Sequence, residues 1–231
     1  MVLEEDNLET LTIAISDGRT IYSNIRKTLH YLLATNFSEI EVMFLAGALG
    51  LGSPLNAMQL LWINLISDIF PGLSLALDPP EPDVMESPPR DHEEPIVKAE
   101  DFRRLAFESS LMTGSCLAAY GYGIARYGMG AHAATLAFQS LTSAQIVHAL
   151  TCRSETRSIF DNEYRAPNNF LNIAVVTSLG MQLAAQFFPP LRTLLGLTPL
   201  TAIDGLVAGA SALFPLLVCE ATKKPKQGNL A

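Results

Sequence analysis

Two short groups of polar residues lie inside long apolar stretches of the sequence. Asn36 and Glu39 are three positions apart, and Asn64, Ser67 and Asp68 follow at positions i, i+3 and i+4. At 3.6 residues per turn, each group occupies one face of a helix. Together they offer carboxylate, amide and hydroxyl oxygens, which are the ligands that hard cations such as Ca²⁺ prefer. The pattern predicts a cation site between two helices.

The two carboxylates carry most of this prediction. An asparagine or serine in a membrane helix is ordinarily a hydrogen-bonding contact between helices. An ionisable group near the middle of a bilayer costs roughly 2.5–3.5 kcal/mol on insertion scales and indicates function by default. Glu39 and Asp68 each have polar neighbours on their own helix face, so we expect both to bind the cation.

Pro71 follows the second group directly. Proline has no N–H, so it cannot bond the carbonyl of Ser67 four residues earlier, and Gly72 weakens the helix further. Irregular backbone at membrane depth is tolerated only where it lines a cavity or is covered by protein. We therefore expect a partly unwound helix whose free Ser67 carbonyl faces a ligand or water.

Gln145 and His148 lie one turn apart in a later apolar stretch. Gln145 could supply a neutral ligand, whereas His148 is expected to be packed or interfacial. Glu41 is two residues from Glu39 and therefore points elsewhere, either to another helix or to a proton path.

Four further polar residues are weaker candidates for the site. Glu108 and Asp204 lie near the ends of apolar stretches, where a long or terminal side chain reaches water at little cost. Gln182 and Gln186 share one helix face and are expected to form hydrogen bonds between helices.

The composition is that of a charge-poor, apolar chain. Of its 231 residues, 49% are hydrophobic and 16% are charged, against about 25% charged in average globular domains. The net charge is −8 and no basic stripe exists, so a nucleic-acid partner is not expected. The three cysteines are widely spaced, with no CxxC motif and no cluster with histidine, so a zinc site is not expected either.

Six stretches are long enough to cross a bilayer, which needs roughly 20 mostly apolar residues. They cover residues 31–51, with a helix beginning as early as Gly18, and then 55–77, 105–127, 133–151, 170–188 and 200–219. The predicted fold class is all-α, a polytopic membrane bundle of six transmembrane helices. The alternative is a soluble all-α protein with buried helices.

The distribution of positive charge favours the membrane interpretation. If six crossings leave both ends on one side, all 15 lysines and arginines except Arg126 and Arg192 fall on that side. The positive-inside rule then places both termini in the cytoplasm. The proline-rich loop at 78–104 should lie there as an extended segment. The short outer turns suggest an integral protein of a bacterial plasma membrane.

Three motifs resemble a known family: YLLATNFSEI, LLWINLISD and ALDPPEPDVMESPPR. Nearly the whole chain is similar to the C-terminal membrane part of P-type cation-transporting ATPases, in the calcium-pump branch. The resemblance implies helices five to ten of such a pump. Residues 1–17 would end the phosphorylation domain, 18–77 would be two transmembrane helices with half of the cation site, 78–104 a cytoplasmic loop, 105–222 four more helices, and 223–231 a cytoplasmic tail.

The resemblance also implies the ligands of the transported cation. Asn36 and Glu39 would bind the cation from one helix, and Asn64, Ser67 and Asp68 from the next. Membrane lipid would surround the bundle as a whole. Gln145 falls where two-site pumps carry a glutamate, which weakens the case for a second ion. The expected ion is Ca²⁺, and Mn²⁺, which also accepts oxygen ligands, stays open.

The sequence contains no DKTGT, no GDG-x-ND and no room for a nucleotide-binding domain. ATP and Mg²⁺ would therefore act only through missing domains, and the chain is expected to be a fragment, a split-gene product or a pseudogene remnant. Its expected partner is an N-terminal pump half or an intact pump. Two alternatives stay open: a non-catalytic membrane scaffold or modulator of a pump, and a passive cation pore.

Overall fold

The computed structural model describes residues 8–82, 84–86, 95–154, 158–159 and 166–223. Every regular element in these residues is helical, which confirms the all-α class. The long elements are α1 (Leu8–Ala48), α4 (Ala99–Tyr127), α5 (Ala131–Thr151), α6 (Asn169–Phe187) and α8 (Ala202–Ala221). The segment between α1 and α4 consists of α2 (Ala57–Ile63), the π-helix η1 (Asn64–Ile69) and α3 (Phe70–Ala76), and α7 (Pro189–Leu195) links α6 to α8.

The bundle is built around α5. Nearly all of its side chains are buried, including Phe138, Leu141 and Ile146. It packs against α1, η1, α3, α4, α6 and α8. A helix that is buried all round needs no apolar stripe, which explains why its small and polar residues alternate with large apolar ones.

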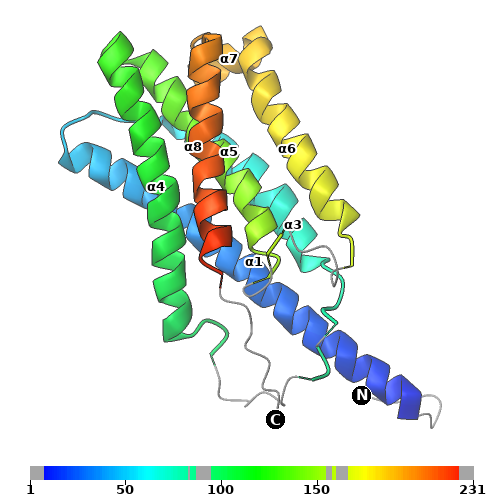
Figure 1. The fold of residues 1–231 in the computed structure, drawn as a ribbon. Coiled ribbons are helices and arrows are strands. Elements are labelled where there is room, and N and C mark those ends of the chain that lie inside the picture. The colour runs from blue at the N-terminus through cyan, green and yellow to red at the C-terminus, as the bar shows by residue number, and fades with distance from the viewer. Residues whose placement is uncertain (1–7, 83, 87–94, 155–157, 160–165, 224–231) are drawn as a thin grey trace.

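The long helix α1 crosses the bundle obliquely, and its N-terminal part extends beyond the other helices (Figure 1). It starts at Leu8, earlier than the predicted start at Gly18. Its C-terminal end is closed by Gly50, which has a φ of 66° and donates to Gly47, while Leu51 donates to Ala46. Glycine takes this left-handed conformation without strain.

Each of the six predicted stretches is mostly helical in the structure, but the helices differ from one another in length and polarity. Three of the described helices are long and apolar enough to cross a membrane: the continuous helix Ala57–Ala76, Asn169–Phe187 and Ala202–Ala221. Each of them turns large apolar side chains outward. Examples are Leu61, Leu73, Val176, Leu206 and Leu217, all more than half exposed. Such faces suit lipid.

The segment predicted as a loop, residues 78–104, is helical at its C-terminal end. The described residues 78–82, 84–86 and 95–98 contain no helix, as its prolines predict. Helix α4, however, begins at Ala99 because the carboxylate of Asp101 accepts a hydrogen bond from the backbone N–H of Lys98 at 2.7 Å. Residues 87–94 and the tail beyond 223 lie outside the described residues.

The ends of the described chain, at the start of α1 and the end of α8, lie toward the same end of the bundle (Figure 1). Helices α4, α5, α6 and α8 run alternately up and down along it (Figure 1). A close approach of α4 and α5 is made possible by Gly123, where an added Cβ would lie 2.8 Å from the Cα of Ala133. Small residues of this kind let membrane helices pack tightly.

Candidate cation site

The helix that carries Asn64, Ser67 and Asp68 changes its winding at these residues. Asn64–Ile69 is π-helical, between two α-helical segments of seven residues each. Single π-helical turns inside α-helices are rare and are frequent at functional sites. The expected unwinding is therefore replaced by a wider winding, which still changes the direction in which the side chains point.

The Ser67 carbonyl was expected to face a ligand or water, but a protein side chain bonds it instead. The hydroxyl of Tyr31, on α1, donates a hydrogen bond to it at 2.6 Å. Tyr31 is fully buried. The missing N–H of Pro71 is thus replaced by a side chain from the neighbouring helix, which fixes η1 against α1 and removes this carbonyl from the candidate ligands.

Five of the six predicted ligands are joined by hydrogen bonds across three helices. The amide of Asn36 donates to Asp68 Oδ2 at 3.3 Å, and Ser67 Oγ lies 3.4 Å from Asp68 Oδ1. Ser67 Oγ also donates to Gln145 Oε1 at 3.2 Å, and Gln145 Nε2 donates to Glu39 Oε1 at 3.3 Å. Residues from α1, η1 and α5 therefore connect the two carboxylates.

Asn64 stands apart from this network. Its amide donates to the carbonyl of Leu60 at 3.1 Å, one turn back on its own helix. Asn36 is exposed and also bonds its own helix, at the carbonyl of Leu32. In the described part of the chain, the Asn64 side chain forms no hydrogen bond with the other predicted ligands.

Two residues that the sequence did not single out belong to the site. Thr35 and Ser38, both on α1, are fully buried. Thr35 Oγ1 donates to Asp68 Oδ1 at 3.2 Å, and Gln145 Nε2 donates to the Thr35 carbonyl and to Ser38 Oγ, each at 3.1 Å. Thr35 lies four residues before Glu39 and so shares its helix face, which was the available signal for it, whereas Ser38 is adjacent to Glu39 and had no such signal.

Among the residues that the structure describes, the two carboxylates have no positive partner. Within the described residues, neither Glu39 nor Asp68 lies within ion-pairing distance of a lysine, arginine or histidine. Glu39 is only 7% exposed. Buried charges are ordinarily paired or coordinate metals. In the described structure, the hydrogen bonds to these two acids come from neutral hydroxyl and amide groups, which leave the negative charge uncompensated. The arrangement is therefore suited to a cation.

One family model and several known proteins match the chain. The family model described as "Cation transporting ATPase, C-terminus" matches residues 52–224. The chain belongs to this family. It is 37% identical over 92% of its length to a calcium-transporting ATPase of Bacillus subtilis, and 34% identical over 98% to calcium-transporting ATPase 1 of Bacillus cereus. A mouse calcium-transporting ATPase, type 2C member 2, is 30% identical over 96% of the chain.

The chain spans only about a quarter of each of these relatives: 24%, 27% and 24% of their lengths. It corresponds to the C-terminal region of a P-type calcium pump, as the motifs in both cation-site helices indicated. The relatives are ion transporters, and the three apolar helices agree with a location in a membrane.

Two acids that were expected to reach water are buried in this ATPase region. Glu108 is 3% exposed and Asp204 is fully buried. Asp204 accepts hydrogen bonds from Tyr127, from His132 at 3.2 Å and from the N-terminus of α8, where Thr201 N donates to Oδ2 at 2.9 Å. Asp204 forms a capping box with Thr201, the N-cap residue of α8, as suits an acid in the first turn of a helix.

The remaining polar expectations have mixed outcomes. Glu41 contacts another helix, as expected, accepting from Ser109 and Thr113 of α4 at 2.9 Å each. Gln182 bonds Gln139 at 3.0 Å and accepts from Trp62 at 2.8 Å, which confirms a contact between helices. The amide of Gln186, by contrast, has no partner among the described residues.

Proposed function

We propose that this chain forms the cation-binding part of the membrane region of a calcium pump and helps to carry Ca²⁺ across a membrane. Glu39 and Asp68 supply the charged oxygens, and Asn36, Ser67 and Gln145 supply neutral ones. Asn64 joins them when its side chain turns from Leu60. Hydrolysis of ATP, with Mg²⁺, belongs to domains outside this sequence, contributed by an N-terminal pump half or by an intact pump.

One observation carries the proposal: two carboxylates with no positive partner in the described part of the chain are held by hydroxyl and amide groups at a π-helical turn. Ca²⁺ takes six to eight oxygens. The six named side chains supply six when each gives one oxygen, and eight when both carboxylates bind through two; water or the rest of the pump can supply any further ligand. The calcium-transporting relatives favour Ca²⁺ over other hard cations.

In the proposed pump, all six predicted helices cross the membrane and both termini are cytoplasmic. The part of α1 that extends beyond the bundle would connect the site to the cytoplasmic domains (Figure 1). Tyr31 and Thr35 on α1 bond η1 directly, so a movement of α1 would alter the positions of Ser67 and Asp68. Two states that differ in Ca²⁺ affinity are what transport requires.

The test uses the chain co-expressed with the N-terminal half of a related pump, with Ca²⁺-stimulated ATP hydrolysis in membranes as the readout. The parent chain should restore stimulation. Asp68→Asn and Glu39→Gln should each raise the Ca²⁺ concentration for half-maximal stimulation by at least about tenfold, because the loss of one charged ligand removes more than about 1.4 kcal/mol of binding.

Glu41→Gln is the matched control. It makes the same chemical change two residues from Glu39, on the face that contacts α4, and keeps its oxygen for Ser109 or Thr113. Stimulation should persist in this variant. Equal stimulation in the parent, Asp68→Asn and Glu39→Gln would show that these acids do not bind the transported ion.

A further inference from the structure

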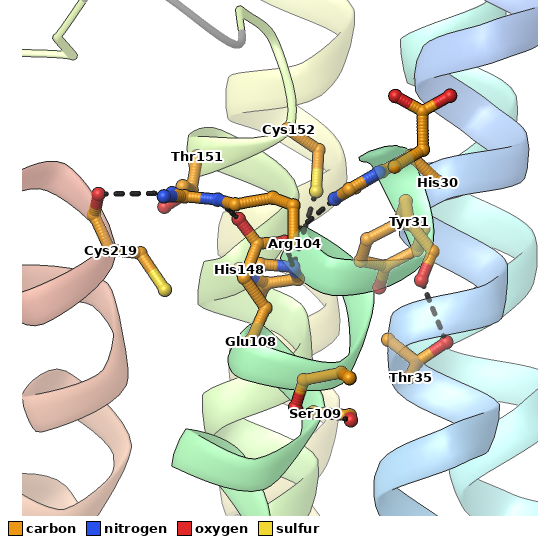
Figure 2. A network of polar contacts seen from close by, with 12 residues as sticks. His30, Tyr31, Thr35, Arg104, Glu108, Ser109, His148, Thr151, Cys152 and Cys219 are labelled. Carbon is orange, nitrogen blue, oxygen red and sulfur yellow. Dashed lines mark hydrogen bonds and ion pairs between the residues drawn. The ribbon is translucent and has the colours of Figure 1, made fainter. Parts of the chain in front are cut away.

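A second group of metal-binding side chains lies away from the cation site. His30 on α1, Glu108 on α4 and Cys152 at the end of α5 place one donor atom each within 4.8 Å of one another. His148, one turn before Cys152, joins them: its Nε2 lies 3.2 Å from Glu108 Oε2 and 3.3 Å from Cys152 Sγ. Figure 2 shows these four side chains converging from three helices.

The contacts centre on one carboxylate oxygen. Glu108 Oε2 lies 2.7 Å from His30 Nε2 and 3.2 Å from His148 Nε2. The other oxygen, Oε1, accepts a hydrogen bond from Arg104, which also donates to the Cys219 carbonyl. Arg104 therefore orients the carboxylate and leaves Oε2 turned toward the two imidazoles and the thiol.

The donor set differs in chemistry from the oxygen site. Two imidazole nitrogens, one thiol and one carboxylate are the ligands of zinc and of similar transition metals, whereas Ca²⁺ takes oxygen only. Donor atoms around a tetrahedral zinc ion with bonds of about 2.0–2.3 Å lie roughly 3.3–3.8 Å apart. Separations of 2.7, 3.2 and 3.3 Å lie below or at the lower limit of this range, and the other pairs among His30, Glu108 and Cys152 lie within 4.8 Å, so small shifts in both directions would seat an ion.

Burial favours a stable complex. His148 is 1% exposed, Glu108 3% and Cys152 7%, and His30 is the most accessible of the four, with 14% of its side chain exposed. The Glu108 carboxylate and a Cys152 thiolate would offset the charge of a divalent ion in this setting. Since the thiol must lose its proton to bind, complex formation would release a proton.

We infer that His30, Glu108, His148 and Cys152 form a binding site for a transition-metal ion of the zinc class, separate from the calcium site. The sequence disfavoured zinc because its cysteines and histidines are scattered; only the folded bundle brings His30 to the H-x₃-C pair of α5. An ion here would tie α1 to α4 and α5 and so restrain the helix that carries Glu39.

The test titrates the full 231-residue chain, purified in detergent, with Zn²⁺ and with Co²⁺ as a spectroscopic substitute. We expect one equivalent of tightly bound metal, a thiolate-to-cobalt charge-transfer band, and release of protons on binding. Cys152→Ser should remove the band, and His30→Gln should weaken Zn²⁺ binding on the order of tenfold or more.

Controls separate this site from the calcium site and from unfolding. Cys116→Ser removes another buried thiol, on α4, and should leave the cobalt band intact. Asp68→Asn should lose Ca²⁺ binding and retain Zn²⁺. The parent chain needs no variant to decide the question: a cobalt complex without the thiolate band, or no tight Zn²⁺ binding, overturns the inference. Equal Zn²⁺ affinity in parent and His30→Gln also overturns it.

Discussion

At the scale of single residues, the sequence indicated which types would form the site but not their hydrogen-bonding roles. Glu39 and Asp68 were identifiable because an unpaired acid in an apolar helix is costly. The role of Tyr31 was not identifiable, because the carbonyl that it bonds is freed by Pro71, forty positions away along the chain. Thr35 and Ser38 resemble ordinary small residues of membrane helices until the neighbouring helices are in place.

The neutral side chain of Gln145 joins Ser67 to Glu39 by hydrogen bonds. Its substitution by an acid tests whether this position borders the cation. In Gln145→Glu, a third carboxylate lies beside Glu39 and the donations to Thr35 and Ser38 are lost. Without Ca²⁺ the variant should unfold at a lower temperature than the parent, because like charges are buried together. At a Ca²⁺ concentration 100 times its own Kd, the variant should gain about 2.7 kcal/mol of stability. The parent, which lacks the added carboxylate, should gain less at the same Ca²⁺ concentration, so its unfolding temperature should rise less.

Thermal unfolding of the detergent-purified chain, with and without Ca²⁺, measures both effects. Gln139→Glu is the control: Gln139 lies on the same helix and bonds Gln182, away from Glu39. This variant should lose stability and gain nothing specific from Ca²⁺. If the two variants respond alike to Ca²⁺, Gln145 does not border the ion.

At the scale of helices, the apolar stretches located the elements, but capping and burial decided their limits and roles. Helix α4 begins before its apolar stretch because Asp101 caps it. The π-helical winding of η1 has no signal in the apolar pattern, although Pro71 and Gly72 indicated an irregular helix beside it. The pairing of Glu108 with His30 and His148 joins residues far apart in sequence, so only the packing of α1, α4 and α5 reveals it.

The contact between α4 and α5 depends on the absence of a side chain at Gly123. In Gly123→Ala the new Cβ would lie 2.8 Å from the Cα and 3.0 Å from the Cβ of Ala133, and backbone cannot yield as a flexible side chain does. We expect a loss of about 1–3 kcal/mol in the free energy of unfolding. The measurement is equilibrium unfolding of the purified chain in mixed micelles.

Gly121→Ala, two residues earlier on the same helix, is the matched control, since an added Cβ there meets nothing within 4 Å. It should be neutral or slightly stabilising, because alanine is the better helix former. A loss in Gly121→Ala as large as that in Gly123→Ala would mean that helix propensity, not the contact between α4 and α5, sets the effect.

At the scale of the whole molecule, buried ion pairs fix the end of the bundle that collects the positive charges. Asp78, 5% exposed, lies 3.1 Å from Lys27 and 3.0 Å from Arg153, and accepts a hydrogen bond from Asn168 at 2.8 Å. It thus joins α1 to the segment between α5 and α6. Lys27 and Arg153, two of the cations that the sequence predicts on one side of the membrane, therefore have a structural role at this end of the bundle.

The orientation of the chain in the membrane can be tested with two variants, each of which replaces one exposed methionine by cysteine. Met85, in the loop after α3, is 43% exposed, and Met129, between α4 and α5, is 64% exposed. The native cysteines Cys116, Cys152 and Cys219 are all buried, so they compete little for a thiol reagent. If Lys and Arg collect on the cytoplasmic side, a membrane-impermeant maleimide should label Met129→Cys in intact cells, and Met85→Cys only after permeabilisation. Labelling of both variants in intact cells would place the two connections on the same side, and the six-crossing arrangement of the bundle would then be wrong.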